Sequence, residues 1–422
     1  MTVTRLAVAE ASAHMLAGVR ALGSEEVPLA RTLGRVLARD VVSPVSLPPW
    51  DNASMDGFAV RAADVAGAAA DRPVTLRVVE TIAAGKRGTR AIRAGEAARI
   101  MTGAPVPEGA DSVVRVEDTD PAGAADVVAI RDDRDATRNI RARGEDVRAG
   151  SVVLRDGTPI GPAHVGVLAS VGCAAPVVHV RPRVAILATG DELVPLERFD
   201  AVRTGERIVS SNSYSLEEAV LAAGGVPVPL GIAPDEPDAL AECLKGAEGC
   251  DMVLTSGGVS VGDFDYTRTV VDALGGELSL WRVRMRPGAP LAFGRLFGVP
   301  WLGLPGNPVS ALVTFELFGR PLLRVLGGHR RPHRRTVQVT LQEEVQLAAP
   351  LTHYLRAVLT SEPDGAMLAS LTGPQSSGML TSMAAADALV VIAGERTTIP
   401  KGTPLPAILL DGDMTGSDRF PG

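Results

Sequence analysis

The chain has 422 residues, of which 46% are hydrophobic and only 3% aromatic, and its formal net charge is -7. This length predicts roughly three domains, with cores built mainly from Ala, Val, Leu and Ile. The acidic balance argues against a nucleic-acid-binding protein, which would present a basic face. No apolar run reaches the ~18 residues of a membrane span, and no signal-peptide pattern opens the chain, so we expect a cytoplasmic protein without membrane contact.

The first forty residues predict short helices, and residues 147–176 return to the same kind of pattern. A second short helix is expected over 33–39, before an extended segment at 41–42. We therefore predict an N-terminal helical/linker domain made of residues 1–46 and 147–176. The first helix places four apolar residues on one face: Val8, Ala11, Met15 and Val19.

The segment 47–146 differs from its surroundings. Short β-like runs such as 74–79 and 112–116 are separated by Gly, Pro and Asp, and no long helix interrupts them. We predict that this segment is a β-rich domain inserted between the two parts of the N-terminal domain.

Residues 177–327 predict a three-layer α/β domain. Strand-like and helix-like runs alternate there, which is typical of a parallel sheet with helices on both faces. Residues 336–412 give alternating short runs and predict a C-terminal all-β barrel or sandwich, so the fold class is α/β plus β in a multidomain chain. In the α/β domain, strands are predicted at 183–188, 226–232 and 251–255, and helices at 215–223, 236–247, 264–274 and 308–325.

A basic run and three cysteines could suggest binding or redox sites, but both have simpler structural interpretations. The run 329–335 holds four arginines and two histidines, and we interpret it as a solvated linker in preference to an anion-binding or partner-binding patch. Cys173, Cys243 and Cys250 show no Cys-x-x-Cys spacing, so we expect buried reduced thiols and not a redox or metal site.

Ligands of open α/β sheets bind beyond the carboxyl ends of the strands, where this chain carries unusual loops at 189–193, 256–265 and 305–308. Glycines let successive backbone N–H groups face an anion, and Asn307 can cap the helix that follows it. Each loop alone could be a tight turn, but three at one sheet edge favour a phosphate-bearing ligand. The residues expected to bind it are Ser256, Gly257, Gly258, Ser260, Pro305, Gly306 and Asn307.

Carboxylates stand beside these loops. Glu192 and Asp265 lie within them, and Asp235 follows another predicted strand. A carboxylate next to a phosphate is repulsive unless a cation bridges the two, so these three residues are candidate Mg²⁺ ligands. The alternative for each is a helix N-cap or a first-turn charge, and for Asp235 this is the stronger interpretation locally.

Basic residues alternate with apolar ones between 281 and 286. The alternation places Arg282, Arg284 and Arg286 on one face of a predicted strand. Such a face can bind an oxyanion through forked, charge-assisted hydrogen bonds, and the alternative is the polar side of an edge strand.

A set of motifs is spread over nearly the whole chain. They are Ser54-Met55-Asp56-Gly57-Phe58-Ala59, Ile100-Met101-Thr102-Gly103-Ala104-Pro105-Val106-Pro107, Gly144-Glu145-Asp146-Val147, Thr189-Gly190-Asp191-Glu192-Leu193, Ser211-Asn212-Ser213-Tyr214, the loop that starts at Ser256, and Gly303-Leu304-Pro305-Gly306-Asn307-Pro308-Val309-Ser310. Their order and spacing are very specific. Together they resemble the molybdopterin molybdenumtransferases, the bacterial counterparts of the E domain of gephyrin.

The resemblance implies four domains and an elongated homodimer, in which the α/β domain of one subunit faces the β-rich insert of the other. It implies a transferase that uses Mg²⁺, splits adenylylated molybdopterin with release of AMP and inserts molybdenum from molybdate to give molybdenum cofactor. Molybdopterin adenylyltransferase and molybdoenzyme apoproteins or their chaperones are the partners consistent with it. The implied cleft residues are Asp56, Thr102, Asp146, Glu192, Asp235 and Asp265, with Arg356, Ser376 and Ser377 near it and Arg282 and Arg286 attracting molybdate.

Two positions depart from the family's pattern. Ala289 stands where the family commonly has the lysine of Arg-Pro-Gly-Lys-Pro, and Ser376 replaces a glycine of Gly-x-Gln-Gly-Ser-Gly. These departures leave room for an alternative, a catalytically weak paralogue that binds and delivers molybdopterin or molybdenum cofactor. A third possibility is a related adenylyltransferase, which would not need the β-rich insert.

Overall fold

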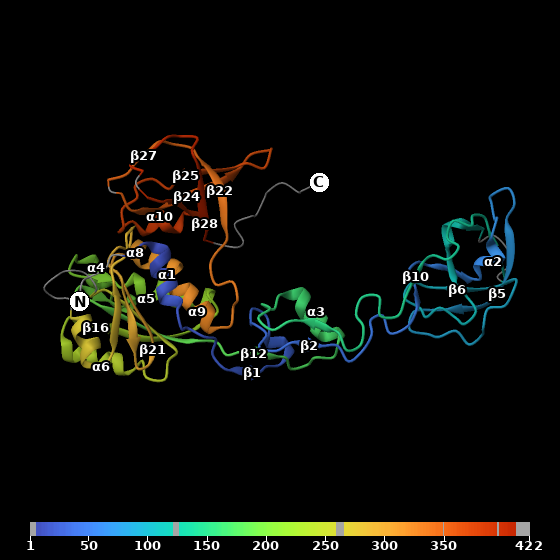
Figure 1. Cartoon of the computed structure of the whole chain (residues 1–422), viewed down its shortest axis with the longest axis horizontal. Helices are drawn as coiled ribbons and strands as arrows, with labels where there is room; N and C mark the ends of the chain where they lie inside the picture. Colours follow the sequence, from blue (N-terminus) through green and yellow to red (C-terminus); the bar gives the residue numbers. More distant parts are fainter. Residues whose placement is uncertain (1–5, 121–125, 259–265, 349, 395, 411–422) are drawn as a thin grey trace.

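The structure is a computed structural model that describes residues 6–120, 126–258, 266–348, 350–394 and 396–410. The chain is elongated, with the α/β region and the C-terminal barrel at one end and the β-rich region at the other (Figure 1). Short strands and α3 (Pro162–Ser170) lie between these two ends. Among the described residues, none of the helices is both long and apolar enough to cross a membrane.

The α/β region contains one six-stranded sheet. Its order is β16-β13-β17-β21-β20-β18, and the first four of these strands are parallel. The expected all-parallel sheet is wrong in one respect, because β20 runs antiparallel to both of its neighbours. The strands are β13 (Arg183–Thr189), β16 (Val226–Ala233), β17 (Met252–Ser256), β18 (Glu277–Trp281), β20 (Ala292–Leu296) and β21 (Val299–Leu304).

A tight hairpin causes the reversal between β20 and β21. Its two turn residues, Phe297 and Gly298, have φ values of +52° and +80°. Positive φ at both positions matches the twist of antiparallel strands, so the chain returns at once along its neighbour. The Phe-Gly pair is a weaker sequence signal for this turn than Asn-Gly or Asp-Gly, which is why the alternation of strands and helices concealed it.

Helices cover both faces of this sheet, and the strand residues alternate between two cores. Ile186 and Leu254 pack into the core on one face, whereas Leu187 and Val253 pack into the core on the other. The helices on the first face are α1 (Val8–Leu16), α5 (Ser211–Ala222), α8 (Pro308–Thr314) and α9 (Arg320–Leu326), and those on the second are α6 (Pro237–Lys245) and α7 (Thr267–Ala273).

The N-terminal helix α1 packs on the α/β core. Ala11 and Met15 are fully buried in the same cluster as Ile186, and α1 lies beside α9 in Figure 1. The helix ends at Leu16, so Val19, which we expected on its apolar face, lies beyond it. The N-terminal segment therefore helps to complete the domain that holds the candidate site.

The second predicted helix is wrong. Residues 33–39 form a turn and two isolated bridges, in which Val36 pairs with Pro159 and Leu37 with Val178. Gly34 at a φ of +75° interrupts the helical geometry. Pairing with two distant segments overrides the local helical propensity. The other strands of this region are β1 (Ser24–Glu26), β2 (Val41–Val42), β11 (Val152–Leu154) and β12 (Val177–His179).

Two further regions of the chain consist mainly of β-strands. The β-rich region, residues 47–146, holds an open sheet of order β7-β4-β6-β5-β9-β8, and the C-terminal region closes into a five-stranded barrel, β24-β25-β22-β28-β26. The open sheet consists of β4 (Gly57–Val60), β5 (Val74–Ile82), β6 (Glu96–Ile100), β7 (Ser112–Arg115), β8 (Thr119–Asp120) and β9 (Val127–Ile130). The barrel consists of β22 (Thr336–Leu341), β24 (Thr352–Ser361), β25 (Met367–Leu371), β26 (Ala388–Ile392) and β28 (Pro404–Leu409).

The basic run 329–335 makes defined contacts. Arg334 donates two hydrogen bonds to the Glu316 carboxylate at 2.6 and 3.0 Å, and Arg330 pairs with Asp156. Burial, followed by the charges of neighbouring arginines, lowers the pKa of His329 to about 4, so its ring is neutral at physiological pH. All three cysteines are free, and burial raises the pKa of Cys173 and of Cys250, as expected for reduced thiols.

Candidate functional site

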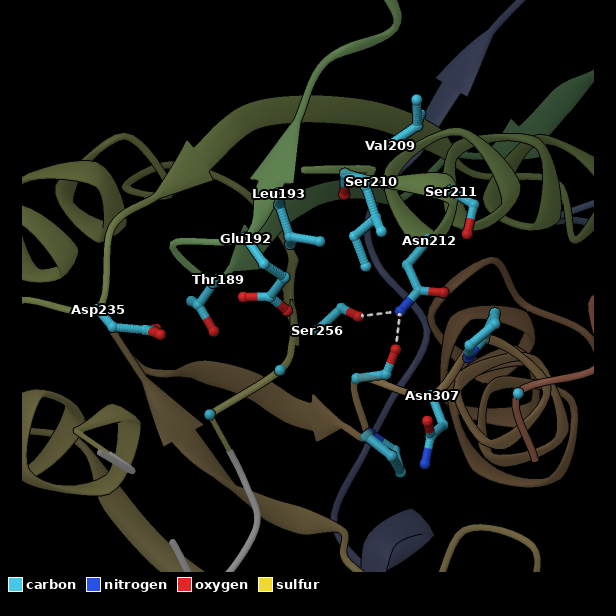
Figure 2. A pocket seen from close by; sticks show the side chains of 18 of the residues that line it. Thr189, Glu192, Leu193, Val209, Ser210, Ser211, Asn212, Asp235, Ser256 and Asn307 are labelled. Carbon is cyan, nitrogen blue, oxygen red and sulfur yellow. Dashed lines mark hydrogen bonds between the residues drawn. The ribbon is translucent and has the colours of Figure 1, made fainter. Parts of the chain in front are cut away.

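A pocket of about 710 Å³ opens at the carboxyl edge of the α/β sheet (Figure 2). Its walls come from the ends of β13, β17 and β21 and from the start of α5, so it lies where parallel sheets usually bind ligands. The structure thus brings together most of the predicted loop residues. Those lining the pocket are Glu192, Asp235, Ser256, Gly257, Gly258, Pro305, Gly306 and Asn307. Ser260 and Asp265, also predicted for this site, lie outside the described residues.

The loop after β17 needs its two glycines. Gly257 and Gly258 have φ values of +97° and +62°, a region that other residues rarely adopt. A Cβ atom at Gly257 would lie 2.6 Å from the carbonyl oxygen of Thr189, and one at Gly258 would collide with the Thr267 hydroxyl. The backbone therefore packs closer to Thr189 and Thr267 here than a side chain would permit.

Asn307 occupies the position expected for a helix cap without acting as one. It precedes Pro308, the first residue of α8, but its side chain makes no capping hydrogen bond and is exposed in the pocket. The predicted cap is therefore wrong. An uncommitted amide in the pocket wall can instead hydrogen-bond a ligand through either its oxygen or its nitrogen.

Asp235 lies close to two other carboxylates, those of Asp191 and Glu192. Burial raises the pKa of Asp235, and the negative charges of Asp191 and Glu192 raise it further. The backbone N–H of Asp235 donates to the Asp191 carboxylate at 3.2 Å. Within the described part of the chain, no group of three or more acidic, His or Cys side chains is arranged to hold a metal.

A second pocket of about 680 Å³ adjoins the first, since both are lined by Pro290 and Asn307. It lies between the α/β region and the barrel. Arg286 is exposed at its edge, and Ala289 forms part of its wall. Ser376 and Ser377, two of the predicted substrate-binding residues, line it from the barrel side.

The three alternating arginines do not share a strand. β18 ends at Trp281, and Arg282 has a φ of +93°, which turns the chain away from the α/β sheet. Met285–Arg286 form β19, which pairs with β24 of the barrel. The single-strand prediction is therefore wrong, and Arg282 lines neither of the two pockets whereas Arg286 lines the second.

Arg356 lies beneath the loop that carries Ser376 and Ser377. Its side chain is fully buried and donates to the carbonyl oxygens of Gln375 and Ser376 at 3.2 and 3.0 Å and to the Ser382 hydroxyl at 3.0 Å. A guanidinium with these partners holds the loop in place. Arg356 also lines the second pocket, so its role in substrate binding stays a prediction beside its support of this loop.

The remaining predicted residues lie in the β-rich region, at the opposite end of the chain (Figure 1). Thr102 donates two hydrogen bonds to one oxygen of Asp56, from its backbone N–H and from its hydroxyl, each at 2.7 Å. These bonds lower the pKa of Asp56, and the Arg99 charge lowers it further. Asp146 is exposed in the same region. One chain therefore does not bring these residues to the α/β pocket.

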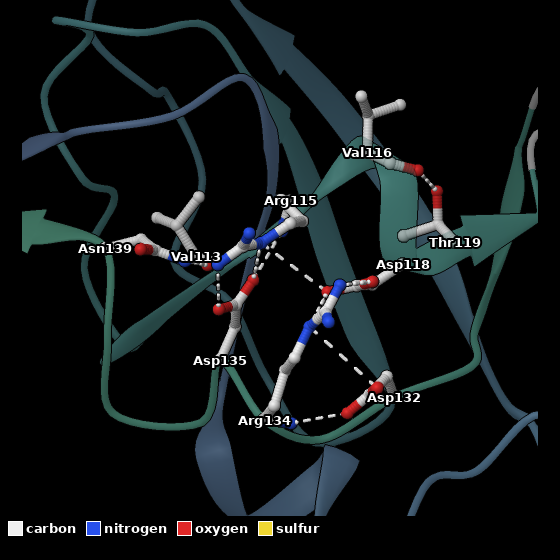
Figure 3. Close-up of polar contacts among 9 residues, drawn as sticks. All are labelled: Val113, Arg115, Val116, Asp118, Thr119, Asp132, Arg134, Asp135 and Asn139. Carbon is white, nitrogen blue, oxygen red and sulfur yellow. Dashed lines mark hydrogen bonds and ion pairs between the residues drawn. The ribbon is translucent and has the colours of Figure 1, made fainter.

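The β-rich region also contains an ion-pair network that the sequence did not reveal (Figure 3). Arg115 donates to both oxygens of Asp135 at 2.8 and 2.9 Å, and Arg134 pairs in the same way with Asp118. Asp135 is only 1% exposed. The residue after Arg115, Val116, donates its backbone N–H to the carbonyl of Asp56 at 3.1 Å.

Asn212, which belongs to the Ser211-Asn212-Ser213-Tyr214 motif, had no predicted role. In the structure its amide donates to the Ser256 hydroxyl at 2.7 Å and to the Gly306 carbonyl at 2.8 Å, as Figure 2 shows. The sequence signal for it is the position of this motif between two predicted strand-end loops, 189–193 and 256–265.

Three family models match successive parts of the chain. Residues 6–172 match the MoeA N-terminal region (domain I and II), residues 185–325 match a probable molybdopterin binding domain, and residues 338–410 match the MoeA C-terminal region (domain IV).

Similar proteins cover almost the whole length. Molybdopterin molybdenumtransferase 2 of Mycobacterium tuberculosis is 39% identical over 92% of this chain and 95% of its own length. The molybdopterin molybdenumtransferase of Bacillus subtilis is 34% identical over 92% of this chain and 90% of its own. Among solved structures, a molybdopterin biosynthesis MoeA protein from Pyrococcus horikoshii superposes with a TM-score of 0.83 at 29% identity, covering 96% of this chain and all of that one.

Proposed function

The chain belongs to the molybdopterin molybdenumtransferase family and has a role in molybdenum cofactor biosynthesis. From this premise we propose which substrate each of its two pockets binds. Adenylylated molybdopterin binds in the first pocket, its pterin–AMP bond is cleaved with release of AMP, and molybdenum from molybdate joins the dithiolene sulfurs. The observation that carries the proposal is the meeting of two glycine loops and two carboxylates in one pocket at the carboxyl edge of the sheet.

The glycine loops provide the phosphate-binding part of the first pocket. Gly257 and Gly258 let the backbone approach an anion closely, and Gly306 lies directly beside them, since a Cβ at Gly306 would be 3.7 Å from the Cα of Gly257. Ser256 and Asn307 add side-chain hydrogen-bonding groups to the same wall. This arrangement suits the phosphate oxygens of adenylylated molybdopterin.

The acidic residues of this pocket fit Mg²⁺ when substrate is present. Mg²⁺ is usually held by one or two carboxylates together with substrate phosphate oxygens, and Glu192 and Asp235 supply two carboxylates here. The raised pKa of Asp235 shows that its environment favours neutralisation of the charge. We include Asp265 as a third candidate from its position in the sequence. A bound Mg²⁺ would neutralise phosphate charge and stabilise the departing AMP.

The β-rich region supplies the remaining catalytic groups. The hydrogen bonds from Thr102 keep the Asp56 carboxylate ionised and fix its orientation, so it can accept a hydrogen bond from an attacking water and hold that water in place. Asp146 adds a second exposed carboxylate in the same region.

This assignment requires a homodimer, because within one chain the β-rich region and the α/β pocket lie at opposite ends (Figure 1). A second copy can bring its Asp56, Thr102 and Asp146 to the first pocket. Sedimentation analysis tests this directly, since a monomer with full activity would exclude a shared site.

The second pocket is suited to molybdate, which is a dianion. Arg286 supplies a positive charge, and the loop of Ser376 and Ser377, held by the buried Arg356, supplies hydroxyl and backbone donors. We propose that molybdate binds in the second pocket while adenylylated molybdopterin occupies the first. Molybdopterin adenylyltransferase would supply that substrate, and apo-molybdoenzymes or their chaperones would receive the product.

The decisive experiment measures AMP release from adenylylated molybdopterin with Mg²⁺, with and without molybdate. Release that depends on molybdate supports the transferase. Tight pterin binding without release would contradict the proposal and would favour a carrier of molybdopterin. That alternative is weakened by the retained carboxylates Asp56, Glu192 and Asp235, which a carrier does not require.

A further inference from the structure

The first pocket contains a buried amide that contacts two of its loops at once. Asn212 lies in the first turn of α5 and is 8% exposed. Its Nδ2 group donates one hydrogen to the Ser256 hydroxyl oxygen at 2.7 Å and the other to the Gly306 carbonyl oxygen at 2.8 Å. One side chain therefore ties the end of β17 to the loop that follows β21.

The chemistry of these partners fixes the orientation of the amide. A backbone carbonyl only accepts hydrogen bonds, so the atom facing Gly306 must be the nitrogen of Asn212. The Oδ1 atom is then turned away, and it is buried without a hydrogen-bond partner among the described residues. Leaving a buried acceptor unpaired costs free energy, which indicates that the two donated bonds are the reason for keeping an amide here.

The orientation of Asn212 also determines what Ser256 can do. Since Ser256 Oγ accepts a hydrogen from Asn212, its own hydrogen must point elsewhere. Ser256 lines the first pocket and is 3% exposed, and its hydroxyl has no acceptor among the described residues. The hydroxyl is thus left with one hydrogen to donate to a ligand oxygen in the pocket.

We propose that Asn212 is a positioning residue for substrate phosphate: it makes the Ser256 hydroxyl a donor towards the pocket and fixes the spacing of the two glycine loops. The inference rests on the proposed function, because it assigns an anionic ligand to this wall of the pocket. Asn212 itself need not touch the ligand; it acts through Ser256 and Gly306.

The isosteric variant Asn212→Asp tests the proposal. At neutral pH its carboxylate accepts hydrogen bonds and donates none, so it repels the Gly306 carbonyl and draws the Ser256 hydrogen away from the pocket. A hydrogen bond to a charged group contributes enough that we expect KM for adenylylated molybdopterin and Kd for AMP to rise about ten- to a hundredfold, with a much smaller change in kcat. AMP binding is measured by calorimetry, independently of turnover.

The double variant distinguishes positioning from a general structural role. Ser256→Ala removes the same donor, so adding it to Asn212→Asp should weaken AMP binding little further, whereas independent effects would multiply. The defect of Asn212→Asp relative to wild type should also shrink as pH falls, because the protonated carboxyl regains one donor. Ser215→Ala is the matched control, since it removes a bond to the backbone of Asn212 at 3.3 Å on the same helix without touching either loop.

The outcomes separate this inference from the proposed function. Wild-type affinity in Asn212→Asp, or multiplicative effects in the double variant, would overturn the positioning role even if wild-type enzyme releases AMP. Wild-type enzyme that binds AMP but never releases it from adenylylated molybdopterin would contradict the proposed function while the affinity measurements still decide the role of Asn212. Absence of both binding and turnover would refute both.

Discussion

Two aspartates at opposite ends of the chain are perturbed in opposite directions. Asp56, in the β-rich region, is exposed and accepts two hydrogen bonds from Thr102, which lower its pKa. Asp235, in the α/β pocket, is partly buried beside Asp191 and Glu192, and its pKa is raised. Donors around a carboxylate keep it ionised, whereas burial and like charges prepare it for neutralisation. The two carboxylates therefore lie in opposite electrostatic environments, which suits the roles proposed above, a water-orienting group at Asp56 and a cation ligand at Asp235.

The two regions also hold their site residues by different means. Beside Asp56, arginine–carboxylate pairs support the backbone, and the charges are already balanced. In the α/β pocket, Asn212 and the glycine loops hold the wall through uncharged hydrogen bonds, and neither Glu192 nor Asp235 forms an ion pair with a described residue. The negative charge of the pocket therefore remains available to a ligand cation.

The largest effect is expected from removing the charge of Asp56. Asp56→Asn keeps the shape of the side chain but loses the negative charge that orients the attacking water, so we expect kcat for AMP release to fall about 10²- to 10³-fold. Asp64→Asn is the matched control, because Asp64 lies in the same region and also accepts a backbone N–H, from Gly95 at 3.0 Å. An unchanged kcat in Asp56→Asn would contradict the catalytic role proposed for Asp56 and its difference from Asp235.

The next effect concerns the ion pairs that support Asp56. Asp135→Asn weakens the two-point contact with Arg115, and because Asp135 is almost fully buried we expect a loss of about 2 kcal/mol in the free energy of unfolding. The lowered pKa of Asp135 gives the sign of the pH dependence: its stabilisation is present above the ordinary carboxyl pKa and is lost as pH falls through the folded-state value.

Urea unfolding followed at neutral and acidic pH measures this prediction. Arg134→Gln is the control, since Arg134 is more than half exposed and its loss should cost less. Equal stability of Asp135→Asn and wild type at neutral pH would mean that the network contributes no net stability, and the contrast between the two regions would then rest on the site residues alone.

A smaller and opposite effect on stability is expected at Asp235. Because its pKa is raised, its stabilising contribution is greatest below the ordinary carboxyl pKa and is lost as pH rises through the folded-state value. At pH 7 the charged form is therefore unfavourable, and Asp235→Asn should raise Tm while lowering activity about tenfold. Thermal unfolding from pH 8 to pH 4 should show the difference in Tm shrinking towards the acidic end. A lower Tm at pH 7 would contradict the cause that we assign to the shifted pKa.

The sequence predicted the residues that line the α/β pocket better than it predicted the strands around the pocket, because the pocket residues follow recognisable apolar strand runs. Gly257, Gly258 and Gly306 follow strands whose apolar runs are clear, so their common edge followed from the topology of parallel strands. The hairpin at Phe297–Gly298 and the positive φ of Arg282 are backbone features without a strong residue signal. They account for the wrong strand direction and the wrong arginine face.

Other features depended on distant partners. The bridges of Val36 and Leu37 join segments more than one hundred residues away and replaced a predicted helix with extended chain. The burial of Arg356 depends on a loop twenty residues further along the chain, and the pairing of Arg115 with Asp135 depends on how a turn folds back over β7. No local pattern encodes such contacts, so periodicity could not predict them.

The smallest effect is expected at Ala289, in the second pocket. Ala289→Lys adds an ammonium group near Arg286, and a second positive charge in a partly solvated pocket should lower KM for molybdate a few-fold without changing kcat. Ala348→Lys places the same charge elsewhere in the wall of that pocket and is the matched control. If both variants lower KM equally, the pocket attracts molybdate through its overall field. An effect confined to Ala289→Lys would instead show that molybdate is bound beside Arg286, on the side of the pocket that adjoins the glycine loops.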